Sequence, residues 1–174
     1  MHLWSLENLQ EFESLIGYKF KNPYLIIQAL THSSYANENY VPSNERLEFL
    51  GDIVLGFVIS DFLYNHSPRL NEAEMSQIRA YLVCKKSLSK VARKLFIGKF
   101  LFLGKGEKLS GGENKDSILA DAMEALIGAI YLDGGIESVR KFLLRIISET
   151  FALELFQQLE EQDFLQNLQS MQSL

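Results

Sequence analysis

Apolar residues recur at helical spacing along almost the whole chain, and alternating polar and apolar runs of strand length are scarce. This periodicity predicts an all-α fold. Residues that start and stop helices agree with it, because Asn22-Pro23 precedes one apolar run and Asp133-Gly134-Gly135 follows another. We expect helices over residues 5–16, 23–31, 44–65, 72–83, 86–96, 116–132 and 136–158. The Gly-rich stretch 105–115 is expected to connect two helices, and the Gln-rich tail to be a docked or a frayed helix.

Two pairs of acidic residues stand on predicted helices that are otherwise strongly apolar. Glu48 and Asp52 are four positions apart, and Asp121 and Glu124 are three apart, with no other charge between residues 118 and 132. Because side chains at these spacings share a helix face, each pair presents two carboxylates side by side. A buried ionised carboxylate is costly unless it is paired or metal-bound. Pairing with Lys or Arg, protonation and binding of a divalent cation therefore remain as explanations.

Metal binding makes the most specific prediction of the three. If the two helices pack with their acidic faces together, the four carboxylates form one cage of hard oxygen ligands. Such a cage suits Mg²⁺, with Mn²⁺ as a substitute, and leaves room for a substrate phosphate and water. This arrangement indicates metal-assisted hydrolysis of a phosphodiester. The alternative interpretation is that the acids form ordinary surface salt bridges.

The three histidines point to no zinc or di-iron chemistry. They show neither the HExxH spacing of a zinc protease nor the ExxH spacing of a helical di-iron site. His32 lies in the stretch Thr31-His32-Ser33-Ser34, where it could touch RNA. We favour a capping or packed histidine at a helix end.

Basic residues are concentrated in one segment, although the net charge of the chain is -5. Between residues 85 and 115 there are nine Lys or Arg residues and two acidic ones. Exposed helices often carry such lysines without a function, but a basic face beside an acidic site is typical of a protein that binds a polyanion. The candidate phosphate-binding residues are Lys85, Lys86, Arg93, Lys94, Lys105, Lys108 and Lys115.

Length and composition are those of one domain with a substantial core. A single cysteine, Cys84, excludes an intramolecular disulfide framework, and no apolar stretch follows a basic start. The apolar runs fall short of the roughly 20 residues of a membrane span. We therefore expect a cytoplasmic protein that does not enter membranes.

The run Asn-Glu-Arg-Leu-Glu-Phe-Leu-Gly-Asp at residues 44–52 resembles the signature of the ribonuclease III family. Four further stretches resemble that family in its own order, so that the resemblance covers roughly residues 10–150: 29–33, 71–80, 110–112 and 117–128. The resemblance implies a bundle of helices that forms a homodimeric endonuclease domain. It also implies a valley along the dimer that binds double-stranded RNA, short 3′ overhangs in the products, and a role in processing rRNA and mRNA.

The resemblance also implies roles for single residues. It makes metal ligands of Glu48, Asp52, Asp121 and Glu124. Asp52 and Glu124 are the implied catalytic residues, with Glu124 the most critical.

Three further residues gain a role from the resemblance. Glu45 and Glu72 look like additional valley acids, closer to the RNA than to the metal, and Phe49 matches a ring that inserts into the partner subunit. Gly51 fits the same picture, because a glycine inside a helix usually permits a close backbone approach.

Bacterial members of the family usually continue into a C-terminal double-stranded-RNA-binding domain. We expect a catalytic domain over residues 5–158 and a tail or linker over 159–174, with no such RNA-binding domain present. Either a shortened form of a longer protein or a natural single-domain form fits this expectation. A non-catalytic RNA-binding or ribosome-associated scaffold is the competing function, although such relatives are free to lose the acids that persist here.

Overall fold

The computed structural model describes residues 5–66 and 69–172. Within these ranges the regular secondary structure is helical, and the one β interaction is an isolated parallel bridge between Thr31 and Phe102. The predicted all-α fold is therefore confirmed. The chain divides into two compact units, Met1–Phe142 and Leu143–Leu174.

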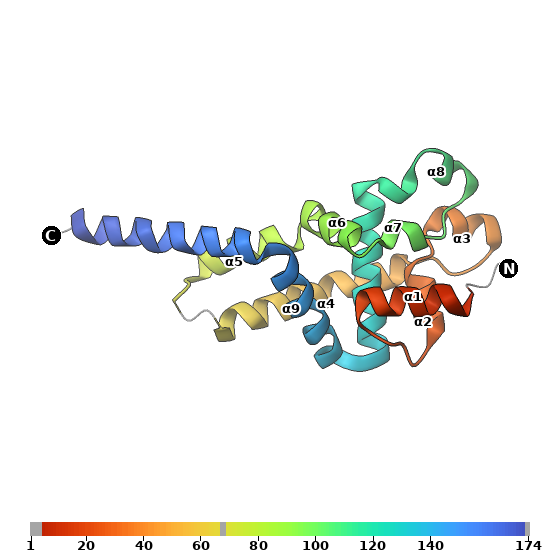
Figure 1. Ribbon diagram of the computed structural model, residues 1–174, viewed down its shortest axis with the longest axis horizontal. Helices are drawn as coiled ribbons and strands as arrows, with labels where there is room; N and C mark the ends of the chain where they lie inside the picture. The colour runs from red at the N-terminus through yellow and green to blue at the C-terminus, as the bar shows by residue number, and fades with distance from the viewer. Residues whose placement is uncertain (1–4, 67–68, 173–174) are drawn as a thin grey trace. The chain divides into compact units, whose positions relative to one another are not determined.

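Figure 1 shows the helices of the chain in order. The elements are α1 (Leu6–Ile16), α2 (Pro23–Ala29), α3 (Ser33–Asn39), α4 (Glu45–His66), α5 (Glu72–Val83), α6 (Lys85–Lys94), α7 (Ile97–Phe100), α8 (Lys105–Leu109), the 3₁₀ helix η1 (Gly112–Asn114) and α9 (Asp116–Gln172). The helix α9 begins in the first unit and ends in the second. No helix in the described part of the chain is both long enough and apolar enough to span a bilayer.

The helix starts follow the local sequence. Asn22 caps α2 by accepting a hydrogen bond from the backbone N–H of Tyr24, and Pro23 occupies the first turn. Asn71 and Glu74 form a reciprocal capping box at the start of α5. These side chains satisfy backbone groups that a helix end leaves without partners, so they fix where each helix begins.

The predicted break after Asp133 is present as a kink inside α9. Gly135 has φ 75° and ψ -178°, a conformation that glycine tolerates and other residues rarely adopt. The Asp133 carboxylate accepts hydrogen bonds from the Tyr18 hydroxyl and from the backbone N–H groups of Lys21 and Asn22. The kink is thereby attached to the loop between α1 and α2.

Helix α4 and the first part of α9 carry much of the core of the first unit. Figure 1 shows α4 in yellow-orange and this part of α9 in teal, crossing within the bundle. Both helices bury a dense set of aliphatic side chains, namely Leu47, Val54, Leu55, Val58, Ile59 and Leu63 on α4, and Leu119, Met123, Leu126, Ile127 and Ile130 on α9. The crossing of these two helices positions the acidic residues.

Three short helices, α3, α7 and α8, were absent from the sequence prediction, and α8 and η1 lie within the stretch 105–115 that was predicted to connect two helices. Contacts distant in sequence explain α8. The Glu38 carboxylate accepts a hydrogen bond from the backbone N–H of Lys105, and the Ser34 hydroxyl accepts one from that of Gly104. Tertiary hydrogen bonds thus stabilise a helix start that local sequence does not favour.

Candidate metal centre

The backbones of α4 and α9 touch at two glycines. A Cβ atom added to Gly51 would lie 1.8 Å from the carbonyl oxygen of Glu124, and one added to Gly128 would lie 2.3 Å from the carbonyl oxygen of Leu47. Any side chain at either position would force the helices apart. The close approach predicted for Gly51 therefore occurs within the chain, and it brings the two acidic helix faces together.

The first turn of α4 is anchored by Asn44, which is buried. Its backbone N–H donates to the carbonyl of Thr31 at 2.8 Å, and its side-chain amide donates to the carbonyl of Ala29 at 3.4 Å. The carbonyl of Asn44 accepts from the backbone N–H of Glu48 at 2.9 Å. The turn that carries Glu48 is consequently fixed to the segment that follows α2.

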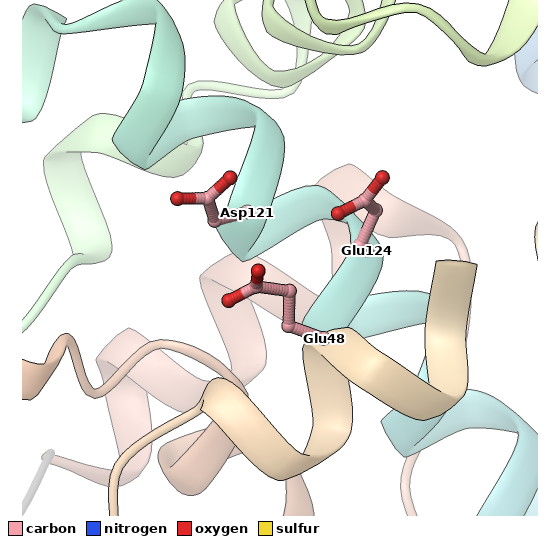
Figure 2. Close-up of side chains that lie close together, drawn as sticks. All are labelled: Glu48, Asp121 and Glu124. Carbon is pink, nitrogen blue, oxygen red and sulfur yellow. The ribbon is translucent and has the colours of Figure 1, made fainter.

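Three of the four predicted metal ligands come together in this structure. Glu48, Asp121 and Glu124 each offer a carboxylate oxygen, and these three atoms all lie within 4.8 Å of one another. Figure 2 shows Glu48 on α4 and the other two acids on neighbouring turns of α9, with their carboxylates gathered between the helices. All three are partly buried, whereas Asp52, one turn further along α4, is exposed and outside the group.

The surroundings raise the pKa of each clustered acid. Burial is the largest cause at Glu124, whose pKa rises to about 7, and the negative charges of Asp52, Glu48 and Asp121 raise it further. Burial followed by the charge of Asp121 raises the pKa of Glu48, and burial raises the pKa of Asp121. Asp52 therefore acts on the cluster electrostatically. Lys85 opposes the rise at all three clustered acids.

The cluster fits a divalent cation by its chemistry. Carboxylate oxygens are the hard donors that Mg²⁺ and Mn²⁺ prefer, and the cluster contains neither histidine nor cysteine. The acids repel one another and lack enough basic neighbours to offset burial, as the raised pKa values of Glu48 and Glu124 indicate. A bound cation would remove this repulsion, so the residues present match a metal centre.

The two predicted valley acids lie outside the cluster. Glu45 is exposed and accepts a hydrogen bond from the Ser43 hydroxyl, and Glu72 is exposed and accepts one from that of Ser76. The charge of Glu45 still contributes to the raised pKa of Glu48. Glu72 lines a cleft of about 430 Å³ between α4 and α5.

Phe49 points away from the core of the chain. Its side chain is 77% exposed, and it begins a row of exposed apolar side chains on one side of α4 that continues with Ile53, Phe57 and Tyr64. We call these four residues the α4 apolar stripe. Isolated exposed apolar residues are common, but a contiguous row along one helix is typical of an interaction surface.

The predicted phosphate-binding residues differ in their contacts. Arg93 forms an ion pair with Asp116, and Lys115 forms one with Glu107, each at 2.6 Å. No ion pair is found within the described ranges for Lys85, Lys86, Lys105 and Lys108. Lys85, the first residue of α6, is also the cation that acts on all three clustered acids.

His32 is the residue near the centre that sequence reasoning left without a role in the chemistry. The structure confirms the predicted cap, because the His32 side chain accepts a hydrogen bond from the backbone N–H of Ser34 at the start of α3. The carbonyl of the preceding residue, Thr31, accepts a hydrogen bond from the backbone N–H of Asn44, which places His32 beside the first turn of α4. This proximity depends on tertiary packing, and the sequence signal was limited to the position of His32 before a pair of serines.

Comparison with known proteins gives a consistent result. A family model described as Ribonuclease-III-like matches residues 22–150. Ribonuclease 3 of Caldanaerobacter subterraneus subsp. tengcongensis is 54% identical over 143 residues, which cover 81% of this chain and 63% of that protein. Ribonuclease 3 of Clostridium perfringens is 51% identical over 139 residues, which cover 79% and 59%. The chain thus spans about three fifths of the length of these curated relatives.

Solved structures give the same picture. The nuclease domain of ribonuclease III from Campylobacter jejuni, described with structural flexibility in a region involved in dimer formation, superimposes with a TM-score of 0.79 at 41% identity. That match covers 83% of this chain and 99% of the other. Dicer from Pichia stipitis matches with a TM-score of 0.57 at 25% identity, over 79% of this chain and 58% of the other.

Proposed function

The chain belongs to the ribonuclease III-like family, and from this membership we propose that it is a metal-dependent endoribonuclease that cleaves double-stranded RNA. The observation that carries the proposal is the convergence of Glu48, Asp121 and Glu124, whose ligand oxygens lie within 4.8 Å of one another. A protein that only bound RNA would have no need for three mutually repelling acids. Their persistence favours the enzyme over the non-catalytic scaffold.

The proposed metal is Mg²⁺, with Mn²⁺ able to substitute. When bound, such an ion activates water, stabilises developing negative charge on the phosphate and assists the leaving oxygen. Glu48, Asp121 and Glu124 would hold it. Of the three, Glu124 has the carboxylate whose charge is most disfavoured by burial when no cation is present. Asp52, whose charge acts on Glu124 from the exposed side of the cluster, is the proposed fourth ligand. We assign Asp52 and Glu124 the catalytic roles.

The proposed active form is a homodimer joined through the α4 apolar stripe. A row of exposed apolar groups on one helix can cover itself in a twofold pair, because each copy presents the same surface to the other. Gly56 lies within this side of α4, and no atom stands within 4 Å of the place where its side chain would be. That open space allows a second α4 to approach, with Phe49 inserted into the partner.

The proposed RNA surface combines lysines that form no ion pair in the described ranges with the acids of the valley. Lys85, Lys86, Lys105 and Lys108 supply phosphate contacts, whereas Arg93 and Lys115 are partly neutralised by their ion pairs. Lys94 remains a candidate by its place near the end of α6. Glu45 and Glu72 lie close to the RNA without holding the metal.

The wider role that we propose is cytoplasmic processing of rRNA and mRNA, with short 3′ overhangs in the cleaved products. Residues 5–158 form the proposed catalytic domain, and residues 159–174 a tail or linker.

The proposal is tested by incubating the protein with an end-labelled, perfectly paired RNA duplex in Mg²⁺ and in EDTA. We expect endonucleolytic products with 3′ overhangs in Mg²⁺, none in EDTA, and little cleavage of either strand alone. Binding of the duplex without cleavage in Mg²⁺ or Mn²⁺ would instead identify the non-catalytic scaffold.

A further inference from the structure

The hydrogen bonds around His32 determine where its ring carries a proton. Nδ1 lies 3.2 Å from the backbone nitrogen of Ser34, which can only donate to it. Nδ1 also lies 2.8 Å from the Ser34 hydroxyl oxygen, which accepts from the backbone N–H of Gly104 at 2.9 Å and so has its own proton free for the ring. Nδ1 is therefore an acceptor, and the neutral ring carries its proton on Nε2.

The same network holds the ring in a fixed place. The backbone N–H of His32 donates to the carbonyl of Phe102 at 3.1 Å. A Cβ atom on Gly104 would lie 2.8 Å from the carbonyl oxygen of Ser34, so the segment before α8 packs directly against the first turn of α3. The imidazole is thus held at Nδ1, its backbone is held by Phe102, and the ring cannot turn its Nδ1 outward without breaking the cap.

The other ring nitrogen is unused by the part of the protein that the structure describes. No hydrogen bond from Nε2 is found there, and His32 is only partly buried. His32 follows Thr31, whose carbonyl accepts a hydrogen bond from the backbone N–H of Asn44 at 2.8 Å, and the carbonyl of Asn44 accepts from that of Glu48 at 2.9 Å, so His32 lies beside the turn that carries Glu48. A nitrogen that carries a proton cannot ligate a metal, but it can donate to an oxygen beside one.

We propose that His32 contacts the RNA substrate directly, with its Nε2–H donating a hydrogen bond to a phosphate oxygen of the strand held at the metal centre. This inference rests on the proposed function. Near an acidic cluster, a neutral donor offers the phosphate a hydrogen bond without introducing a cation that would compete with the metal for the carboxylates. The ring is therefore suited to position the strand.

Two substitutions separate the two ring nitrogens. In His32→Asn the amide oxygen can accept at the Nδ1 position and preserve the cap, since Asn is among the best capping residues, but nothing reaches the Nε2 position. In His32→Gln the longer side chain can bring an amide N–H to the Nε2 position, while the cap is weakened. A role in folding alone predicts harm from Gln, and a role in RNA contact predicts harm from Asn.

The experiment measures duplex RNA affinity by fluorescence anisotropy in Ca²⁺ across a salt titration, together with the melting temperature of each protein. We expect His32→Asn to bind about 3- to 10-fold more weakly, the effect of one net hydrogen bond, with an unchanged melting temperature. The log-log salt slope should also stay unchanged, because loss of a neutral donor releases no counterion. We expect His32→Gln to bind within about twofold of wild type and to melt at a lower temperature.

Three results would overturn the inference while leaving the proposed function intact. The first is that His32→Asn binds duplex RNA with wild-type affinity. The second is that the log-log salt slope of His32→Asn is shallower by about one unit, which would indicate a charged ring. The third is that His32→Asn weakens the Mg²⁺-induced thermal shift while its RNA affinity is unchanged. If the wild-type protein itself binds no duplex RNA, both the proposed function and the inference fail.

Discussion

The backbone of Gly51 in α4 lies against the backbone of Glu124 in α9, so closely that a Cβ atom on Gly51 would stand 1.8 Å from the Glu124 carbonyl oxygen. This contact sets the spacing between Glu48 on one helix and Asp121 and Glu124 on the other. The geometry of the acidic cluster therefore depends on a residue without a side chain.

Replacing Gly51 by alanine should damage both the fold and the centre. We expect Gly51→Ala to lower the free energy of unfolding by on the order of 1 to 3 kcal/mol, because an added methyl group must separate the two helices. The thermal shift produced by Mg²⁺ should shrink as well. The matched control is Gly106→Ala in α8, where no atom lies within 4 Å of the new methyl group and stability should be nearly unchanged. Equal effects of the two substitutions would contradict this reading of the helix crossing.

The raised pKa of Glu124 predicts how stability depends on pH without metal. Because burial and neighbouring acids raise this pKa to about 7 in the folded protein, the folded state holds a proton that the unfolded state releases at lower pH. The contribution of the protonated Glu124 carboxyl to the free energy of unfolding is fully present below the pKa that this group has in the unfolded chain. It is lost as the pH rises through about 7. In EDTA, Glu124→Gln should therefore gain stability relative to wild type between pH 5 and pH 8, as measured by urea unfolding. If the difference in the free energy of unfolding between the two proteins stayed constant across this pH range, Glu124 would not have a raised pKa.

The α4 apolar stripe predicts a dimer that depends on Phe49. We expect wild-type protein to scatter light as a dimer and Phe49→Ala to be largely monomeric, since truncating a buried aromatic residue costs roughly 3 to 5 kcal/mol and a twofold interface contains it twice. Tyr24→Ala is the control, because Tyr24 is 72% exposed in α2 and outside the stripe. A monomeric wild type, or equal behaviour of the two variants, would show that the stripe has another use.

Lysines for which the described part of the chain shows no ion pair, such as Lys105 and Lys108, should dominate the salt dependence of RNA binding. The double variant Lys105→Gln with Lys108→Gln removes two proposed phosphate contacts, so the log-log salt slope should become shallower by about 1.8 units. Lys99→Gln is the control, because Lys99 pairs with Glu11 at 2.6 Å and lies outside the proposed surface. Steady-state kinetics should show a raised KM with a smaller change in kcat for the double variant. If the wild type, the double variant and Lys99→Gln all showed the same salt slope, Lys105 and Lys108 would not contact the RNA.

Local sequence was sufficient for the long helices and for most of the acidic cluster. The apolar periodicity of α4 and α9 and the spacing of their acids predicted which faces meet, and the structure confirms the cluster of Glu48, Asp121 and Glu124. Asp52 was predicted to join them, and its proximity is seen through its effect on the pKa of Glu124. Spacing along a helix gives a shared face but cannot tell which acid of a pair turns toward solvent.

Two further features that escaped prediction depend on contacts between distant segments. Helix α8 begins where Glu38 accepts from the backbone of Lys105, 67 positions later in the chain. The fixed orientation of His32 depends on Gly104 in the same way, through Ser34. Periodicity and local capping rules contain no information about such pairs, so these parts of the site required the structure.

The central claim is tested most directly by the rate at which Glu124→Gln cleaves a perfectly paired RNA duplex in Mg²⁺. The substitution removes a ligand charge with little change in volume. We expect cleavage to fall by several orders of magnitude, the usual scale for loss of an essential group, while the variant still dimerises and binds the duplex in Ca²⁺. Cleavage near the wild-type rate would contradict the account, because Glu124 would then hold no catalytic metal.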